Sequence, residues 1–229
     1  NDLKVSSVAD FDLKLKDISP VTELLNLDMA LQNGLSLSGR ISPDTALTAD
    51  LKARNFRYGK MLFDNIDLIV QTSSNGISLE TYSDKAQLSD SFAIISPGIN
   101  INLMGNDMMI LAVFKGDERN DIGGRLKLMS YLGYNGLQVD FKDSYLMLGK
   151  DTILFDNNNS IGYKDGRFEL NRFGFGKKNE KIVITGAVSD NSRDRLKIAF
   201  QGVNIADFNP ILNKFGLEVQ GKLNNEVIM

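Results

Sequence analysis

The sequence contains no cysteine, no histidine and no tryptophan, and it has 4 prolines in 229 residues. Without cysteine there is no disulfide framework and no thiolate metal site. Without histidine as well, most zinc sites and the usual nucleophile–base triads are excluded. The missing tryptophan removes the common aromatic platform for sugars. We therefore expect a protein that is not an enzyme and has no metal or other cofactor.

An excess of charge of one sign is also missing. The chain has 26 basic and 29 acidic residues, mixed along its length, for a net charge of −3. Nucleic-acid binding needs a basic surface that neutralises phosphates, so no nucleic-acid partner is expected. No run of 18 apolar residues predicts a membrane span, and no basic and apolar leader predicts a signal peptide. Both ends have strand-like sequence, so we expect an internal segment of a longer protein.

The sequence does contain apolar residues that alternate with polar ones. Ile66, Leu68 and Val70 alternate up to a turn at Asn75-Gly76, and Ile77 and Leu79 continue the pattern. Such runs, separated by turn signals roughly every 8–15 residues, predict an almost all-β, antiparallel protein. No linker interrupts them, so 1–229 is interpreted as one continuous segment.

Two short helices are expected among the strands. The first would run from Pro20 to about Gln32 with Ser19 as its cap, and the second would be one turn from Pro210 with Asn209 as its cap. Each helix lies between strand-like stretches, so 11–42 and 196–224 are interpreted as related strand–helix–strand units. Their endings match position for position, GLSLSGRIS against GLEVQGKLN. The spacing of such matches is uneven, which indicates a drifting repeat rather than a regular solenoid.

Strands with one apolar face each need a cover, and two short helices cannot supply it. Three arrangements remain open at this point: a closed sandwich, a barrel, and a sheet folded along its length into a groove. All three need the same alternation, so periodicity does not choose among them. A groove would leave a large exposed apolar surface, and such a surface calls for a ligand.

Three segments resemble a known family. They are LKIAFQGVNIADFNPILNKFGLEVQGKLN (196–224), KIVITGAVSD (181–190) and ISPDTALTADLKARNFRYGKMLFDNIDLIV (41–70). They are similar to the AsmA-like proteins, and within them to the TamB family, the inner-membrane components of the translocation and assembly module. The resemblance implies a long antiparallel sheet curled into a taco-like hydrophobic groove.

The resemblance also implies a location and a function. The segment would lie in the periplasm, as part of a protein anchored in the inner membrane of a Gram-negative bacterium. It would bind and conduct phospholipid acyl chains between the inner and outer membranes, aid outer-membrane protein assembly, or both. An outer-membrane barrel protein would then be a partner, through parts of the protein outside 1–229.

Acyl chains would lie against the aliphatic side chains of successive strands, because each CH₂ kept from water contributes about 0.8 kcal/mol. The expected lipid-binding groove residues are Leu37, Leu51, Leu68, Leu79, Ile101, Leu128, Val139, Ile184, Ile198 and Val219. The alternative function is a closed β-sandwich binding or scaffold module of the cell envelope, in which the same residues form a lipid-free core.

Two polar segments suggest other sites and are better explained as turns. DNNNSIGYKDG (156–166) is rich in oxygen ligands, but Ile161 and Arg167 stand where a calcium loop needs Gly and Glu. Lys177 and Lys178 are basic residues that would suit anionic headgroups, but an exposed turn at 177–179 explains them better.

Overall fold

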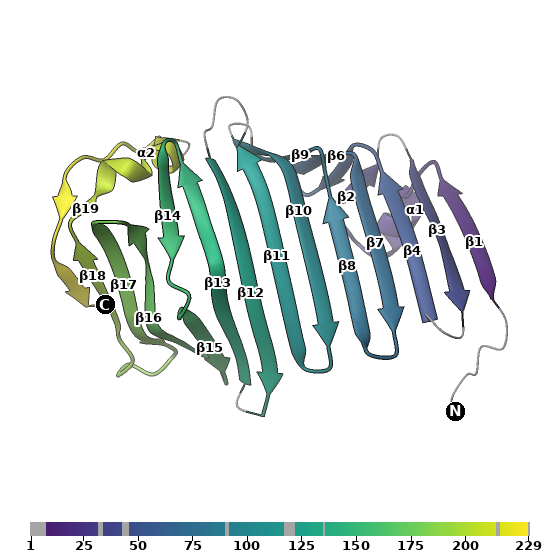
Figure 1. Ribbon diagram of the computed structural model, residues 1–229. Coiled ribbons are helices and arrows are strands. Elements are labelled where there is room, and N and C mark those ends of the chain that lie inside the picture. The colour runs from purple at the N-terminus through teal and green to yellow at the C-terminus, as the bar shows by residue number, and fades with distance from the viewer. Residues whose placement is uncertain are drawn as a thin grey trace. The chain divides into compact units, whose positions relative to one another are not determined.

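The computed structural model describes residues 8–31, 34–42, 46–89, 92–116, 122–134, 136–213 and 216–228 (Figure 1). It is mostly β, with nineteen strands in one large antiparallel sheet and two short strands in a separate pair. The prediction of a mostly β, antiparallel protein is therefore confirmed.

The chain divides into two compact units. The first comprises Asn1–Gly105 and Val113–Lys115, and the second comprises Asn106–Ala112 and Gly116–Met229. Each unit has hydrogen-bonded ladders of its own, and the prediction of one continuous segment over 1–229 stays a prediction.

The strands up to the boundary between the units are β1 (Ala9–Leu15), β2 (Met29–Leu31), β3 (Leu35–Ser42), β4 (Ala46–Ala53), β5 (Phe56–Tyr58), β6 (Met61–Asp64), β7 (Ile66–Ser73), β8 (Gly76–Tyr82), β9 (Lys85–Ser89) and β10 (Phe92–Met104). Strand β11 (Asp107–Gly116) contributes residues to both units. The strands that follow are β12 (Ile122–Gly133), β13 (Gly136–Leu148), β14 (Asp151–Phe155), β15 (Ser160–Lys164), β16 (Arg167–Lys177), β17 (Glu180–Val188), β18 (Leu196–Gln201), β19 (Val203–Asn204), β20 (Lys222–Leu223) and β21 (Glu226–Ile228).

The first unit contains two ladders that share β10. In the larger ladder the pairing runs β1–β3–β4–β7–β8 and then the C-terminal half of β10, and these strands lie side by side in Figure 1. In the smaller ladder it runs β2–β5–β6–β9 and then the N-terminal half of β10. The chain passes repeatedly from one ladder to the other.

Three passages between the ladders of the first unit occur at a polar residue with a left-handed backbone. Asn55 lies between β4 and β5 with φ 51°, Asn65 between β6 and β7 with φ 50°, and Ser96 inside β10 with φ 50°. Asparagine tolerates this region better than other side chains, and one such residue bends a strand without ending its pairing. Buried Ser83 completes the bend between β8 and β9, since its hydroxyl donates to the Asp64 carbonyl over 2.6 Å.

The second unit bends its strands in a similar way. Asp143 inside β13 has φ 44° and Arg172 inside β16 has φ 53°. Opposite Asp143 the pairing of β12 with β13 shifts register between Arg125 and Lys127. The buried hydroxyl of Ser144 accepts from the N–H of Lys127 over 2.9 Å, which satisfies the donor that the shift leaves unpaired.

The predicted turn at 156–160 contains a buried residue. Asn157 and Asn158 are exposed, as a solvated turn requires, whereas Asn159 is 0% exposed. Its side chain joins this turn to Gly174 of β16. The turn is therefore part of the packing of the unit.

The first predicted helix is shorter than expected. Helix α1 spans Ser19–Leu24, and β2 occupies part of the predicted helical range. Asn26 ends the helix with φ 51°, since its N–H donates to Glu23 and the N–H of Leu27 donates to Thr22. This pair of bonds is a Schellman ending. Gln32 lies outside the described residues.

The predicted helix caps were also wrong. Ser19 is the first residue of α1, and its N–H and hydroxyl donate to the carboxylate of Asp17 over 2.8 and 2.6 Å. The 3₁₀ helix η1 (Ile205–Phe208) precedes α2 (Asn209–Leu212), and its cap is Asn204, whose side chain accepts from the N–H of Ala206. Asn209 therefore lies inside a helical segment.

One strand prediction differs from the structure. Residues 217–221 are irregular rather than a strand, and β20 begins at Lys222. GLSLSGRIS and GLEVQGKLN therefore do not share a structure, although their sequences match. Pro97 and Gly98 lie inside β10, where Ser96 bends the strand and the Pro97 carbonyl accepts from the N–H of Ser83.

Candidate functional site: an open aliphatic face

The larger ladder of the first unit has one apolar face, which we call the aliphatic face. Its side chains form four rows across the strands, because cross-strand partners in register point to the same side. The rows are Leu15–Leu35–Ala53–Ile66, Leu13–Leu37–Leu51–Leu68–Thr81–Ile99, Phe11–Gly39–Ala49–Val70–Leu79–Ile101 and Ala9–Ile41–Leu47–Thr72–Ile77–Leu103. Polar side chains interrupt these rows at the two threonines.

The large side chains of the aliphatic face are not buried. Leu13 is 46% exposed, Ile77 is 46% exposed and Ile99 is 41% exposed. Leu37, Leu51, Leu68, Leu79 and Ile101 are half-buried. A side chain in a closed core is close to fully buried, and on this face Ala53 reaches that state at 4%. The rows therefore form a partly covered surface rather than a closed core.

The aliphatic face covers a wide area of the ladder. Strands about 4.8 Å apart and alternate residues about 6.8 Å apart give the four rows a footprint of roughly 24 by 20 Å, or about 500 Å². The largest apolar patch on a typical soluble monomer is about 300–600 Å² and is often functional, so this face is a candidate interaction site.

The opposite face of the same ladder is polar. Arg40 donates to Asp10 across β1 and β3 over 2.7 Å, and the amide of Asn100 donates to Glu80 across β8 and β10 over 2.8 Å. The hydrogen bond from Arg40 lowers the pKa of the Asp10 carboxyl from its ordinary value. Both groups are exposed, so this face is a hydrated surface with weak ion pairs.

The structure brings together the predicted groove residues of the first unit. Leu37, Leu51 and Leu68 are consecutive members of one row, each paired directly with the next. Leu79 and Ile101 are neighbours in the adjacent row. All five lie on the aliphatic face.

The predicted residues of the second unit form a less open surface. Leu128 pairs with Phe141, Val139 with Ile161, and Ile184 with Ile198. These four predicted residues are half-buried and share one face with a phenylalanine cluster. In that cluster the rings of Phe141 and Phe173 lie 4.9 Å apart and edge to face.

Val219 does not belong to these strands. It lies in the irregular segment 217–221, where its N–H donates to the Asn209 side chain and its carbonyl accepts from it, both over 2.9 Å. The prediction assumed that alternation around Gly221 meant a strand. The φ of 121° at Gly221 departs from strand geometry.

Other members of the aliphatic face escaped the sequence analysis. Phe11 of β1 pairs with Gly39 of β3, and a Cβ on that glycine would lie 2.3 Å from the Phe11 ring. The ring therefore covers the glycine and fills its place in the row. The signal was present, because a glycine inside an alternating strand indicates a close approach by another group.

Within the ranges that the structure describes, no group of three or more acidic side chains is placed to hold a metal ion. In the same ranges no helix is long and apolar enough to cross a membrane.

No family model, no curated protein and no solved structure matches this chain.

Proposed function

We propose that this chain is a lipid-contacting segment whose aliphatic face holds phospholipid acyl chains. The observation that carries the proposal is the set of four in-register aliphatic rows whose large side chains stay half-buried or exposed. Acyl chains would complete the cover that the protein leaves open, at about 0.8 kcal/mol for each CH₂ removed from water.

The proposed site is a groove between the two ladders of the first unit. The strands bend at Asn55, Asn65 and Ser96, and we propose that these bends fold the sheet into a taco-like trough. Acyl chains would slide along the aliphatic rows while headgroups stay at the open rim in contact with water. No bond is made or broken in this function, and no metal or cofactor takes part.

The sequence resemblance to the AsmA-like and TamB families fits this proposal. It suggests a periplasmic segment of an inner-membrane-anchored protein, phospholipid movement between the two membranes, and a partner barrel in the outer membrane. Each of these is proposed together with the acyl-chain site, and each depends on it.

A second candidate is a scaffold module of the cell envelope that binds no lipid. The second unit favours it, because Phe173 of its phenylalanine cluster is 8% exposed and Ile182, the strand partner of Phe175, is also 8% exposed. There the protein supplies its own cover. The two candidates differ in whether the first unit carries lipid.

The test is native mass spectrometry of the purified chain after incubation with phosphatidylethanolamine–phosphatidylglycerol vesicles. Bound phospholipid is expected on the unaltered chain. The double variant Leu51→Gln/Leu68→Gln replaces two adjacent members of one row. Losing contact with about two CH₂ groups at each site should lower the lipid load more than tenfold.

The matched control is Lys52→Gln/Asp67→Asn, which alters the neighbouring pair on the polar face of the same two strands. Its lipid load should equal that of the unaltered chain. An unaltered chain that stays lipid-free and monomeric after incubation would contradict the proposal and favour the scaffold module.

A further inference from the structure

The second unit has an open cavity on the polar face of its sheet, on the side away from the half-buried aliphatic residues. Its volume is about 740 Å³, which is within the range of small-molecule sites. Its lining includes Tyr131, Gln138, Gly162 and Glu169, which are consecutive partners across β12, β13, β15 and β16. The cavity therefore lies along one row of the sheet.

Glycine forms the floor of this cavity. A Cβ built on Gly162 would meet the Cβ of Glu169 at 3.9 Å as its nearest neighbour, so the space above this glycine is open. The backbone of Gly162 has no left-handed φ, so the strand conformation itself does not require glycine there. The missing side chain leaves a depression between Gln138 and Glu169.

A tyrosine ring also lines this cavity. A Cβ on Gly133 would lie 2.4 Å from Cε1 of Tyr131, so the ring lies flat over that glycine. Tyr131 is 53% exposed, so part of its side chain is accessible to a ligand. The negative face of an aromatic ring attracts the weakly positive C–H groups of an apposed ring. Tyr131 can therefore act as the stacking platform that the missing tryptophan would otherwise supply.

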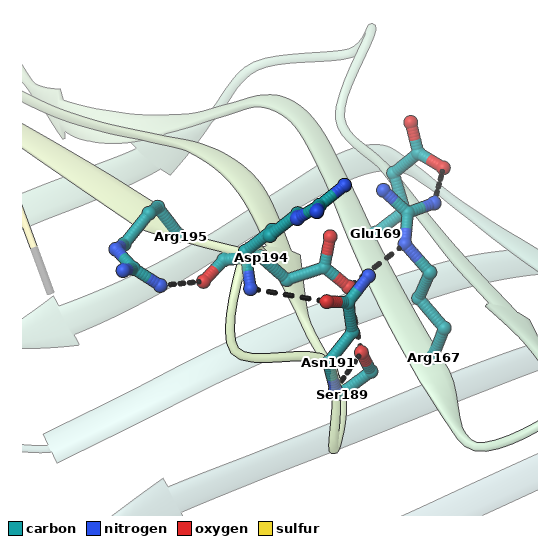
Figure 2. Close-up of polar contacts among 7 residues, drawn as sticks. Arg167, Glu169, Ser189, Asn191, Asp194 and Arg195 are labelled. Carbon is teal, nitrogen blue, oxygen red and sulfur yellow. Dashed lines mark hydrogen bonds and ion pairs between the residues drawn. The ribbon is translucent and has the colours of Figure 1, made fainter.

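The far wall of the cavity is a polar network held by Arg167, shown in Figure 2. Arg167 donates to Asp194 over 3.1 Å and to Glu169 over 2.9 Å. Asp194 also accepts from the hydroxyl of Ser189 over 2.6 Å, and the N–H of Asn191 donates to that hydroxyl over 3.0 Å. These hydrogen bonds hold the loop 189–194 in place. The carboxylate of Asp194 and the amide of Asn191 belong to residues that line the cavity.

The charges of this wall argue against an anionic ligand. The guanidinium of Arg167 is already engaged by two carboxylates, and Asp165 adds a third acidic side chain to the lining. Lys164 lies 5.4 Å from the centre of the Tyr134 ring, over its face. A neutral ligand with several hydroxyls matches the remaining carboxylate, amide and phenol groups, which accept and donate hydrogen bonds.

We propose that this cavity binds one pyranose ring of a neutral saccharide, stacked on Tyr131 over the Gly162 floor with its hydroxyls toward Gln138 and Glu169. The site lies on the face opposite the predicted acyl-chain residues of its unit, and it does not depend on the proposed lipid function. It adds a saccharide-contacting surface to a chain in which tryptophan is absent.

The test is titration calorimetry of the purified chain with glucose, galactose, mannose, N-acetylglucosamine and their short oligosaccharides, with inorganic phosphate as the anionic probe. At least one neutral sugar should bind. Tyr131→Ala removes the platform and should weaken that binding roughly threefold to tenfold. Gly162→Val fills the open space above the floor, where an added Cβ meets no atom closer than 3.9 Å, and should abolish that binding.

Two comparisons keep folding separate from binding. Gly162→Ala adds a single Cβ and should weaken binding less than Gly162→Val, while both keep the thermal unfolding of the unaltered chain. Tyr82→Ala removes an exposed tyrosine of the first unit and should leave sugar binding unchanged. The proposal fails if no sugar binds, if phosphate alone binds, or if Gly162→Val binds sugar as well as the unaltered chain.

Discussion

The side chain of Asn159 exchanges two hydrogen bonds with the backbone of Gly174. Its amide nitrogen donates to the Gly174 carbonyl over 2.7 Å, and its oxygen accepts from the Gly174 N–H over 2.7 Å. The amide thus stands in for a missing strand partner at the place where β16 follows its bend at Arg172. This pairing ties the turn after β14 to the sheet.

Asn159→Ala should strongly destabilise the second unit. The change leaves the buried N–H of Gly174 without a partner, while the Gly174 carbonyl still accepts from the N–H of Asp156. The lost partner costs about 1–3 kcal/mol in the free energy of unfolding. Chemical denaturation followed by far-UV circular dichroism measures this. The matched control is Asn158→Ala at the exposed neighbouring asparagine, which should change stability by less than about 0.5 kcal/mol. Equal effects of the two changes would contradict the role of Asn159.

Arg172→Gly should stabilise the protein. Arg172 has φ 53°, a left-handed conformation that costs an ordinary side chain about 1 kcal/mol and glycine almost nothing. The same measurement should show a gain of about 0.5–1 kcal/mol. Thr185→Gly in the neighbouring strand β17 is the control, and it should destabilise because glycine weakens a regular strand. A loss of stability in Arg172→Gly would show that its side chain outweighs the backbone strain.

A photo-crosslinking residue should distinguish the two faces of β8. Leu79 lies on the aliphatic face and Glu80, one residue later, lies on the polar face. In the presence of phospholipid vesicles, a benzophenone side chain at 79 should form lipid adducts visible by mass spectrometry. The same group at 80 should form several times fewer. Equal yields at the two positions would remove the aliphatic face as the site of contact.

Acid should loosen the loop that carries Asp194. The hydroxyl of Ser189 and then the guanidinium of Arg167 lower the pKa of the Asp194 carboxyl below its ordinary value of 3.8. The folded state therefore binds this proton less tightly than the unfolded state, so the stabilisation is complete above pH 3.8 and is lost as the pH falls through the lowered pKa. Hydrogen exchange of the backbone amides of residues 189–195 should accelerate as the pH falls through this lowered pKa.

Asp194→Asn is the matched variant for this pH dependence. The amide cannot be titrated, so exchange of the loop should no longer depend on pH in the acid range after correction for intrinsic exchange. A variant with the same acid profile as the unaltered chain would assign the effect to another carboxyl group.

The strands were predictable where alternation is regular. Leu37, Leu51 and Leu68 were placed on one face by period alone, and their direct pairing follows from hairpin register. The bends were not predictable, because a left-handed Asn55 or Ser96 looks in the sequence like any polar residue of a strand. The alternation of apolar and polar residues continues through the bend, so the sequence does not show where the chain changes ladder.

Polar turns were the other source of error. DNNNS reads as a solvated turn, and composition does not distinguish the exposed Asn158 from the buried Asn159. The cavity at Tyr131 was missed for a similar reason, since it depends on which residues face each other across four strands. Gly162 and Glu169 are 7 positions apart in the sequence, and the hairpin register makes them partners.

The bent hairpin has a consequence for how a protein of this kind can change in length. In the first unit the chain passes from β4 into β5 at one bend and from β6 into β7 at the next. This bent hairpin therefore adds the pair β4–β7 to the larger ladder and the pair β5–β6 to the smaller one. A whole bent hairpin can therefore be gained or lost while every neighbouring row keeps its register. Insertion of a single residue within one strand would instead turn its aliphatic side chains outward. Evolution can adjust the span of such a sheet in steps of one hairpin.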